Sequence, residues 1–574
     1  MNLTTLHSNL PGGPRPFFAK LPAEILNLIV EQLYLGAKGP RDEPDIEIDD
    51  PSVWRTRQKS ISKAIGSLAA LARTCRRLNK VVVPFLYKEA FLLQANQPPQ
   101  QGGRRGLALY DLLMVLAQEH NGLADLVQVY EEPWTIADNL RAFTGRCDIE
   151  TKPGLMTKQE AESYHAMFPM FNRYIPFLAK MVANEDLLDH PDLLTDIIPA
   201  VIICHCRKMK RLEHLTIGDR GSGLGRFLWR DVITRSVTFP KLEEATLRGK
   251  IYSNLPATAL QHLCAPLAEA VFFVDRAPNL RRLTLDSFSS EPRSTISLLP
   301  QQHLSSLELH QCAFLNKADL VNIIEACPKL ERFVFTSEAS PTVRRVKQLG
   351  FDFLGPQAML EALAPVSQHL KELSIEYTPL IDSLFKNGPN DASTNGAMNA
   401  HDNLGGYENL IKTLGDIGFP NLRNLRICHS ALWRTPLDGP ETNQLVELVK
   451  GCPRLESLDV TQIKIRDAQI RLQLEELAKA MGSVDTVPLL KGIRIAISWP
   501  ASINHRPLLS DLLTEEHLAT YRKRGIKFLV DVICLWSEMS VLNAFSPVHE
   551  SVDKTVTIHP MLQTYDPSRK LLSA

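Results

Sequence analysis

The feature that most constrains the fold of this chain is a repeated apolar pattern, L-x-x-L-x-L, which occurs with conservative replacements. Eight strong copies begin at Leu212, Leu280, Leu304, Leu330, Leu370, Leu422, Leu455 and Leu490, and a weaker copy begins at Leu242. A fixed pattern repeated along a chain indicates stacked units, because a unit too small to bury its own apolar face must bury it against its neighbours. The alternative is that such patterns arise by chance in any chain that contains leucine.

The residues around the copies argue against chance. Five copies have a proline two positions before the first leucine, as in CPKLERFVF from Cys327 and FPNLRNLRI from Phe419. Proline ends a preceding helix, and the alternation that follows is typical of a strand. Between copies, stretches such as 318–326 and 443–450 have apolar residues at helical spacing. Each unit is therefore predicted to be a short strand followed by a helix.

This arrangement resembles the leucine-rich-repeat family, in its irregular form with long units. The resemblance implies an α/β fold, an irregular solenoid or horseshoe over residues 201–500, with parallel strands on the concave side and helices on the convex side. Residues 91–200 are then a helical connection with possible first repeats, one of them near 123–129, and 501–574 form a C-terminal cap and tail. The stretch 387–406, in which nine of twenty residues are Gly or Asn, is expected to be a mobile loop.

Two amphipathic helices are predicted before the repeats, after an N-terminal tail at 1–20. Residues 21–35 (LPAEILNLIVEQLYL) place Ile25, Leu26, Ile29, Val30 and Leu33 on one stripe. A second helix is predicted from residue 61 to about 82, with its arginines toward water, and Pro84 is expected to end it. Between the two lies a segment, 36–60, whose acidic run at 41–50 contains six carboxylates. A solvated loop or a docking site for a basic partner would explain this run.

These residues carry a second resemblance. LPAEILNLIVEQL followed by SLAALARTCRRLNKVVVPFLYKEAF is similar to an F-box, with the acidic segment 36–60 inserted between the two halves. In that family the helices bind a Skp-type adaptor of a cullin ubiquitin ligase, and C-terminal repeats capture the substrate. The resemblance over 21–90 implies an F-box-like helical module. Its implied adaptor-binding residues are Leu21, Pro22, Ile25, Leu26, Ile29, Leu33, Leu68, Leu71, Cys75 and Leu78.

Composition excludes several other classes of function. The chain has 574 residues with 64 Lys and Arg against 64 Asp and Glu, so the overall positive charge that favours nucleic-acid binding is missing. Its longest apolar stretches are too short to span a bilayer, and the first residues lack the apolar core of a signal peptide. Ten dispersed cysteines favour a reducing compartment. We therefore expect a soluble cytoplasmic or nuclear protein without nucleic-acid or membrane partners.

No motif for catalysis, a cofactor or a metal stands out. Cys204, His205 and Cys206 lie close together, but a structural zinc site needs four suitably spaced ligands and no second cluster accompanies them. The Gly-rich stretch 218–225 has neither the G-x-G-x-x-G spacing nor the lysine of known phosphate loops. We therefore predict a non-catalytic protein that needs no cofactor and no metal. An active site assembled from the loops between repeats is the alternative.

The remaining candidate is the concave surface. Side chains alternate along a strand, so the residues between the leucines are expected to face outward on the concave side. These positions are polar and of mixed sign, which suits recognition of a protein segment. The predicted target-binding residues are Arg282, Glu308, Arg332, Glu372, Glu376, Arg426 and Asp459. The alternatives are a merely solvated face, a helical cap in place of the F-box, and a scaffold without a ligase link.

Overall fold

The computed structural model describes the chain in parts. The described residues are 21–38, 63, 65–91, 115–116, 122–131, 199–217, 237–249, 265–290, 295–312, 315–339, 354, 356–379, 410–428, 444–464, 468–481, 489–500, 513–535, 547–551 and 556–558. The tail 1–20, the inserted acidic run 41–50, most of the connection 91–200, the Gly-rich stretch 218–225 and the expected loop 387–406 lie outside them.

A single sheet of 14 strands organises the described residues. Its strands follow in spatial order β1 (Glu89–Phe91), β2 (Val129–Glu131), β3 (Arg211–Thr216), β4 (Glu244–Arg248), β6 (Arg282–Asp286), β8 (Ser306–His310), β9 (Arg332–Ala339), β10 (Glu372–Pro379), β11 (Asn424–Cys428), β12 (Ser457–Lys464), β13 (Gly492–Pro500), β14 (Lys527–Leu535), β15 (Pro547–Ser551) and β16 (Val556–Ile558). Pairing is parallel from β1 to β14 and antiparallel for β15 and β16. The expectation of an α/β fold with a parallel sheet is confirmed.

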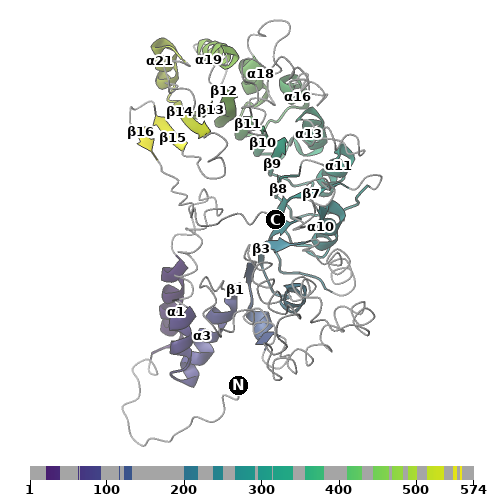
Figure 1. Ribbon diagram of the computed structural model, residues 1–574, viewed down its shortest axis with the longest axis vertical. Coiled ribbons are helices and arrows are strands. Elements are labelled where there is room, and N and C mark those ends of the chain that lie inside the picture. Colours follow the sequence, from purple (N-terminus) through teal and green to yellow (C-terminus); the bar gives the residue numbers. More distant parts are fainter. Residues whose placement is uncertain are drawn as a thin grey trace, which may run out of the picture.

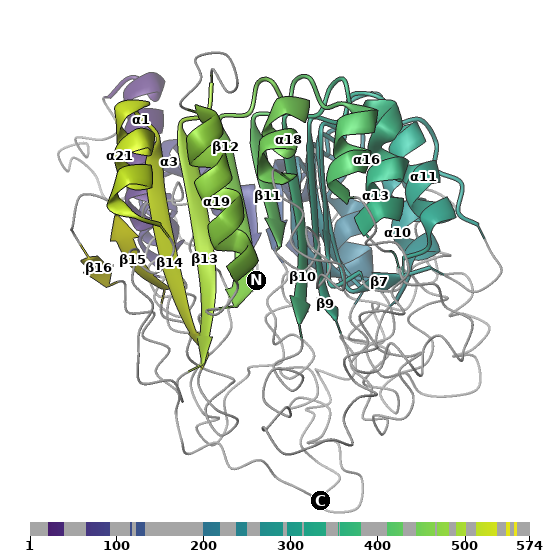
Figure 2. The same ribbon diagram turned by 90° about the horizontal axis from the view of Figure 1, so that it is seen from above.

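Helices lie along one face of this curved sheet (Figures 1 and 2). Residues 199–205 are helical before β3, and the strands that follow are separated by α10 (Leu267–Val274), α11 (Lys317–Ala326), α13 (Pro356–Leu363) with η6 (Ala364–Val366), α16 (Leu410–Ile417), α18 (Gln444–Gly451), α19 (Ala468–Met481) and α21 (Glu515–Lys523). A short second sheet pairs β5 (Ala265–Pro266) with β7 (Phe288–Ser289). The opposite face of the large sheet, which none of the described helices covers, is called the inner face below.

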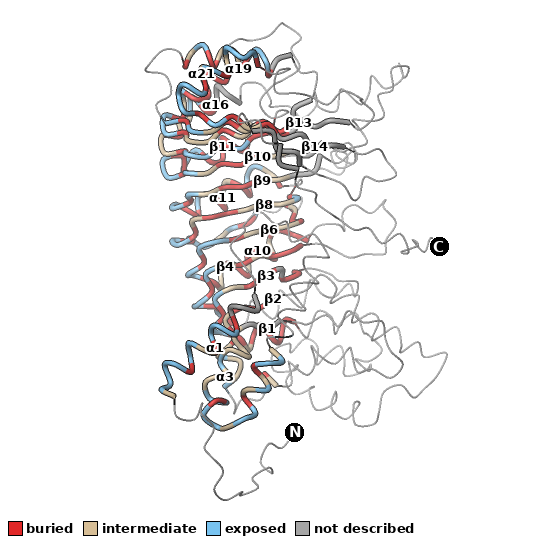
Figure 3. The backbone as a smooth tube through the Cα atoms, turned by 90° about the vertical axis from the view of Figure 1, so that its left-hand side faces the viewer, coloured by how far each residue is buried: buried red, intermediate tan, exposed pale blue. Residues whose placement is uncertain are grey.

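The apolar positions of the repeat fill the space between sheet and helices. Leu283, Leu307 and Phe333 lie next to one another in register on β6, β8 and β9, and each is at most 2% exposed. Buried residues recur in this way along the stack (Figure 3). One continuous core therefore runs through the strands and helices, to which every unit contributes the same few positions.

A regular hydrogen-bond ladder joins the units where the strands begin. The N–H groups of Glu331 and Arg332 both donate to the carbonyl of Ser305, at 2.8 and 2.9 Å. In the same way, two successive backbone N–H groups donate to each of the carbonyls of Gln128, Lys210, Glu243, Arg281, Glu331, Lys371, Arg423 and Glu456. Because only backbone groups take part, units of different sequence and length stack in one geometry.

The register corrects the phase of the first repeat. Leu212 was expected to hold the first apolar position of its unit, but it pairs with Ala245, which holds the second position of the next. The first position belongs to Met209, which is fully buried and whose N–H donates to the carbonyl of Cys206, as Leu330 does to Cys327. Met209 was overlooked because methionine replaces leucine there.

The sheet also extends beyond the predicted repeats at both ends. At the start, β1 and β2 join the ladder through Lys88 and Gln128, and Val127 and Tyr130 are fully buried. At the end, β14 continues the parallel pairing past residue 500, with Phe528 and Val530 both 1% exposed. β2 begins at the end of the possible early repeat expected near 123–129, whereas the leucine pattern revealed neither β1 nor β14.

The N-terminal helices differ from the prediction in two respects. α1 (Ala23–Lys38) forms as expected, but the second predicted helix is broken, since residues 65–72 are helical and α3 (Arg76–Lys88) begins after a turn. Pro84 lies inside α3 and does not end it. Burial explains this tolerance, because Val82 is fully buried and Phe85 and Leu86 pack against the same small cluster on both sides of the proline.

This cluster gives the N-terminal helices a core of their own. Val30 and Tyr34 of α1 pack with Leu68, Ala72 and Val82, and the rings of Tyr34 and Phe85 meet edge to face at 6.0 Å between centroids.

In the described part of the chain, no helix is both long and apolar enough to cross a membrane.

Candidate functional site

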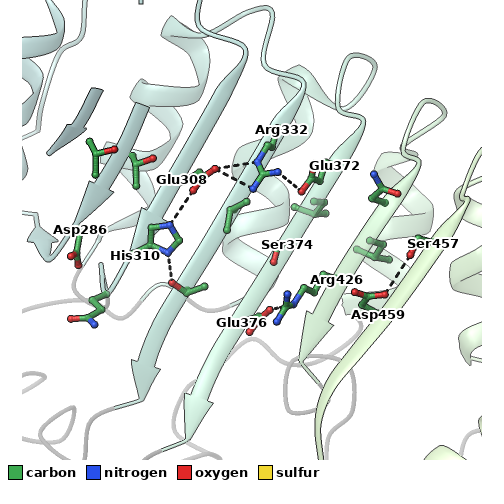
Figure 4. A pocket seen from close by; sticks show the side chains of 18 of the residues that line it. Asp286, Glu308, His310, Arg332, Glu372, Ser374, Glu376, Arg426, Ser457 and Asp459 are labelled. Atoms are coloured by element: carbon green, nitrogen blue, oxygen red, sulfur yellow. Dashed lines mark hydrogen bonds and ion pairs between the residues drawn. The ribbon is translucent and has the colours of Figure 1, made fainter. Parts of the chain in front are cut away.

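The inner face carries a hollow of about 880 Å³ over strands β4 to β12 (Figure 4). Six of the seven predicted target-binding residues line it, namely Glu308, Arg332, Glu372, Glu376, Arg426 and Asp459. Arg282 does not, and its exposed guanidinium lies 3.4 Å from Glu244. Alternation along the strands therefore located most of the hollow, because the leucines on either side of each polar residue are buried beneath it.

The floor of the hollow is formed by short side chains in a row that crosses the strands. One position in register across the sheet holds, in order, Thr284, Glu308, Val334, Ser374, Arg426 and Asp459. Val334 and Ser374 are the short members between longer neighbours, and they are 8% and 6% exposed. Their small side chains leave a gap above the sheet between Glu308 on one side and Arg426 on the other.

On one side of this gap an arginine bridges two carboxylates. Arg332 lies with its Nη1 2.7 Å from Glu372 and its Nη2 3.1 Å from Glu308. The other oxygen of Glu308 lies 3.2 Å from Nε2 of His310, whose Nδ1 lies 2.7 Å from the Thr336 hydroxyl. The hydrogen bond with His310, and then the positive charge of Arg332, hold the pKa of Glu308 below its ordinary value against the opposing effect of burial.

On the other side of the gap the balance is reversed. Glu376 forms an ion pair with Arg426, and its side chain is 16% exposed. Burial nevertheless raises the pKa of Glu376, because the desolvation of its carboxylate outweighs the attraction of Arg426, and the nearby Asp459 adds repulsion. Two carboxylates that face the same hollow are therefore tuned in opposite directions.

Some lining residues were absent from the predicted set. Arg248 and Asp286 lie 3.9 Å apart at the β4 end of the hollow, and His310 lies between Glu308 and Thr336 and contacts both. They occupy the third outward position of their strands, which alternation identifies as well. The predicted target-binding set omitted these four residues, although it included Glu376, which holds the same position on β10 in register with Thr336.

The predicted adaptor-binding residues divide into two groups on the N-terminal helices. Leu26, Leu68 and Leu78 are 1%, 0% and 3% exposed, so their side chains are not available to a partner in this structure. Ile25 and Leu33 are 42% and 48% exposed, Pro22 is exposed, and Leu21, Ile29, Leu71 and Cys75 are half-buried. The apolar stripe of α1 was expected to face one way, but it divides into two sides. One side, with Leu26, Val30 and Tyr34, is buried in the N-terminal helices, and the other side, with Ile25, Ile29 and Leu33, faces outward.

Leu28, which was not predicted, adds to the outward side. It is 54% exposed and lies three residues after Ile25 on the helix, so the two side chains are neighbours. The outer surface of α1 thus presents a group of large apolar side chains, called the α1 apolar patch below: Ile25, Leu28, Ile29 and Leu33.

The candidate metal ligands are buried thiols. Cys204 and Cys206 are 1% and 0% exposed, and burial raises the pKa of each to about 12. A thiol with such a pKa stays protonated at neutral pH and behaves as a small apolar core side chain. Among the described residues, no three His, Cys, Asp or Glu side chains gather as a metal site would require.

The chain matches no protein-family model, and no curated protein shows significant similarity to it.

Proposed function

We propose that this protein is the substrate-recognition subunit of a Skp–cullin–F-box ubiquitin ligase. The stacked strand and helix units support a leucine-rich-repeat solenoid that offers its inner face to a protein target. The N-terminal helices support an F-box-like module that binds a Skp-type adaptor in the cytoplasm or nucleus. In this role the chain makes and breaks no bond, and it brings a bound target close to the catalytic subunits.

The observation that carries the proposal is the α1 apolar patch. Ile25, Leu28 and Leu33 stay more than 40% exposed although the same helix buries Leu26 and Val30 completely or almost completely. Three large apolar side chains left about half exposed on one helix of a small module favour a partner, because covering the remaining area of each would contribute about 1 kcal/mol. The F-box resemblance of these residues names a Skp-type adaptor as that partner.

A second candidate is a scaffold whose N-terminal helices only cap the sheet. It is favoured by the direct passage of α3 into β1 at Glu89, and by Tyr87, which packs against the main core of the sheet. In this case the helices belong to the first unit of the stack and need no adaptor.

The test is a pull-down of purified Skp-type adaptor with the full chain and the variants Leu28→Asp and Leu33→Asp. Each carboxylate would enter an apolar contact without a partner, so adaptor affinity should fall about 100-fold. Leu299→Asp is the matched control, because Leu299 is 59% exposed and lies far from α1 in the sequence. All three variants should keep the wild-type melting temperature, since none of these side chains is buried.

Two outcomes would contradict the proposal. If the wild-type chain does not bind the adaptor, the scaffold with a capped sheet becomes the better account. If Leu28→Asp and Leu33→Asp lower the melting temperature while Leu299→Asp does not, the patch is covered by the chain itself. Leu26→Asp is unsuitable for this test, because Leu26 is 1% exposed and the substitution would destabilise the module.

A further inference from the structure

We infer that the hollow on the inner face selects a cationic segment of its partner, with Lys or Arg side chains, and not a phosphorylated or acidic one. This inference rests on the proposed function in one respect, that the inner face is where the target binds. It adds the chemical class of the target, which neither the repeat pattern nor the N-terminal helices define.

The first argument is the charge of the lining. Five carboxylates face the hollow, from Asp286, Glu308, Glu372, Glu376 and Asp459, against three guanidinium groups, from Arg248, Arg332 and Arg426. Arg494 lies next to Asp459 in register beyond the lining, and counting it still leaves an excess of carboxylates. The field inside a concave surface is set by such an excess and attracts the opposite charge.

The second argument is that the lining arginines are already engaged. Arg332 is held between Glu308 and Glu372, Arg426 is paired with Glu376, and Arg248 lies 3.9 Å from Asp286. A phosphate could bind one of these guanidinium groups only by displacing a carboxylate, and the displaced carboxylate would remain nearby and repel it. An incoming cation can share a carboxylate with the arginine already bound to it, because an ionised carboxylate has about four acceptor sites.

The third argument is the shape of the floor. Along β10 the side chains of Glu372, Ser374 and Glu376 face the hollow, and at about 3.3 Å per residue the two glutamates start about 13 Å apart. Between them lies the gap above Ser374 and Val334, flanked by Glu308 (Figure 4). A Lys or Arg side chain that entered this gap would contact the small neutral side chains of Ser374 and Val334 and would have carboxylates on two sides.

The lining already shows how such a cation is held. Arg332 of the chain itself lies 2.7 Å from Glu372 and 3.1 Å from Glu308, which is the distance range of charge-assisted hydrogen bonds. A partner's guanidinium or ammonium group would make equivalent contacts with the Glu372 oxygen that Arg332 does not contact and with the remaining acceptor sites of the Glu308 carboxylate.

The experiment uses three pools of 12-residue peptides that share the same neutral residues and differ in their charged positions. These positions hold Lys and Arg in one pool, Asp and Glu in the second, and phosphoserine in the third. Each pool is bound at equilibrium to the immobilised full chain at moderate ionic strength, and bound peptides are quantified by mass spectrometry. We expect enrichment from the Lys and Arg pool alone.

Two variants that each remove one charge give opposite predictions. Glu372→Gln removes a charge from the hollow, so binding of the cationic peptides should weaken about tenfold. Arg332→Gln removes the internal cation and frees two carboxylates, so cationic binding should be kept or become tighter. Glu447→Gln is the matched control, because Glu447 lies on α18, away from the inner face, and is ion-paired with Lys450 in a similar way. Melting curves of all variants verify folding.

An anionic target would give the reverse pattern, in which the phosphoserine or acidic pool is enriched and Arg332→Gln abolishes binding. That result overturns the inference, as does the absence of enrichment in any pool or an enrichment that neither variant changes. The adaptor pull-down is independent of this outcome. If the chain binds cationic peptides but no adaptor, the ligase function is contradicted and the inference about the hollow remains. If the chain binds the adaptor but prefers phosphopeptides, the inference is contradicted and the ligase function remains.

Discussion

Truncation of one core residue in the middle of the sheet tests how the units depend on one another. Leu307 of β8 is fully buried, and its register neighbours are Leu283 of β6 and Phe333 of β9. Replacing such a leucine with alanine removes its buried methyl groups and leaves a cavity, so we expect a cost of about 3 kcal/mol for Leu307→Ala. Because β8 pairs only with β6 and β9, most of this cost should fall on those strands.

The assay is amide hydrogen exchange of the full chain, followed by mass spectrometry of its peptides. A loss of about 3 kcal/mol corresponds to a more than 100-fold faster exchange in β6, β8 and β9, whereas β13 and β14 should exchange as in the wild type. Gln302→Ala, at an exposed position shortly before β8, is the control and should change nothing. An equal acceleration in every strand would refute the idea of local stability and show that the sheet opens as one cooperative body.

Three other predictions concern the half-buried carboxylates of Glu308 and Glu376 and the buried carboxylate of Asp319. The pKa of Glu308 is lowered in the folded state, so its carboxylate stabilises the fold at pH values above the unfolded pKa of 4.5. This contribution is lost as the pH falls through the lower folded pKa. Glu308→Gln should therefore be less stable than wild type near neutral pH, and the difference should close below about pH 4. The pKa of Glu376 is raised in the folded state, so its contribution to stability is present below the unfolded pKa and is lost as the pH rises through the folded pKa. Glu376→Gln should therefore gain stability relative to wild type as the pH rises above about 5. Urea unfolding at several pH values measures the stability difference of each variant from wild type, and the same sign of pH dependence for the two variants would contradict this account. Asp319 is 0% exposed and accepts a hydrogen bond from the N–H of Ile296 at 2.9 Å, so Asp319→Ala should cost about 2 kcal/mol in urea unfolding, against less than about 0.5 kcal/mol for the exposed Asp416→Ala, and equal effects would show that this bond adds little.

The sheet was predictable where leucine marks the units and not where other residues replace it. From Leu280 to Ile495 the strands lie where the alternation predicts them. Met209, Val127 and Phe528 hold equivalent positions, but one apolar residue in a short segment does not define a period. Their assignment needed the backbone ladder, which no local pattern encodes.

The inner face was predictable as a surface, and its internal pairing was not. Alternation identified Glu308, Arg332 and Glu372 as outward-facing residues. Their three-way contact depends on the register of three strands whose separations in the sequence differ, and on the gap left by Val334 and Ser374. For the N-terminal helices, an apolar stripe alone could not show which of its sides the module covers, so the buried Leu26 was included among the adaptor-binding residues and the exposed Leu28 was overlooked.

The shared backbone ladder has a consequence for how such a chain can change its length during evolution. Each unit accepts and donates the same backbone groups at its two sides, so an in-frame duplication or loss of one unit would leave every junction chemically equivalent. The unequal distances from Leu280 to Leu304 and from Leu370 to Leu422 show that segments between strands of very different length fit the same junctions. After β14 the pairing becomes antiparallel, so a unit added there would meet a reversed strand. Growth by duplication is therefore open in the interior of the sheet and closed at its C-terminal end.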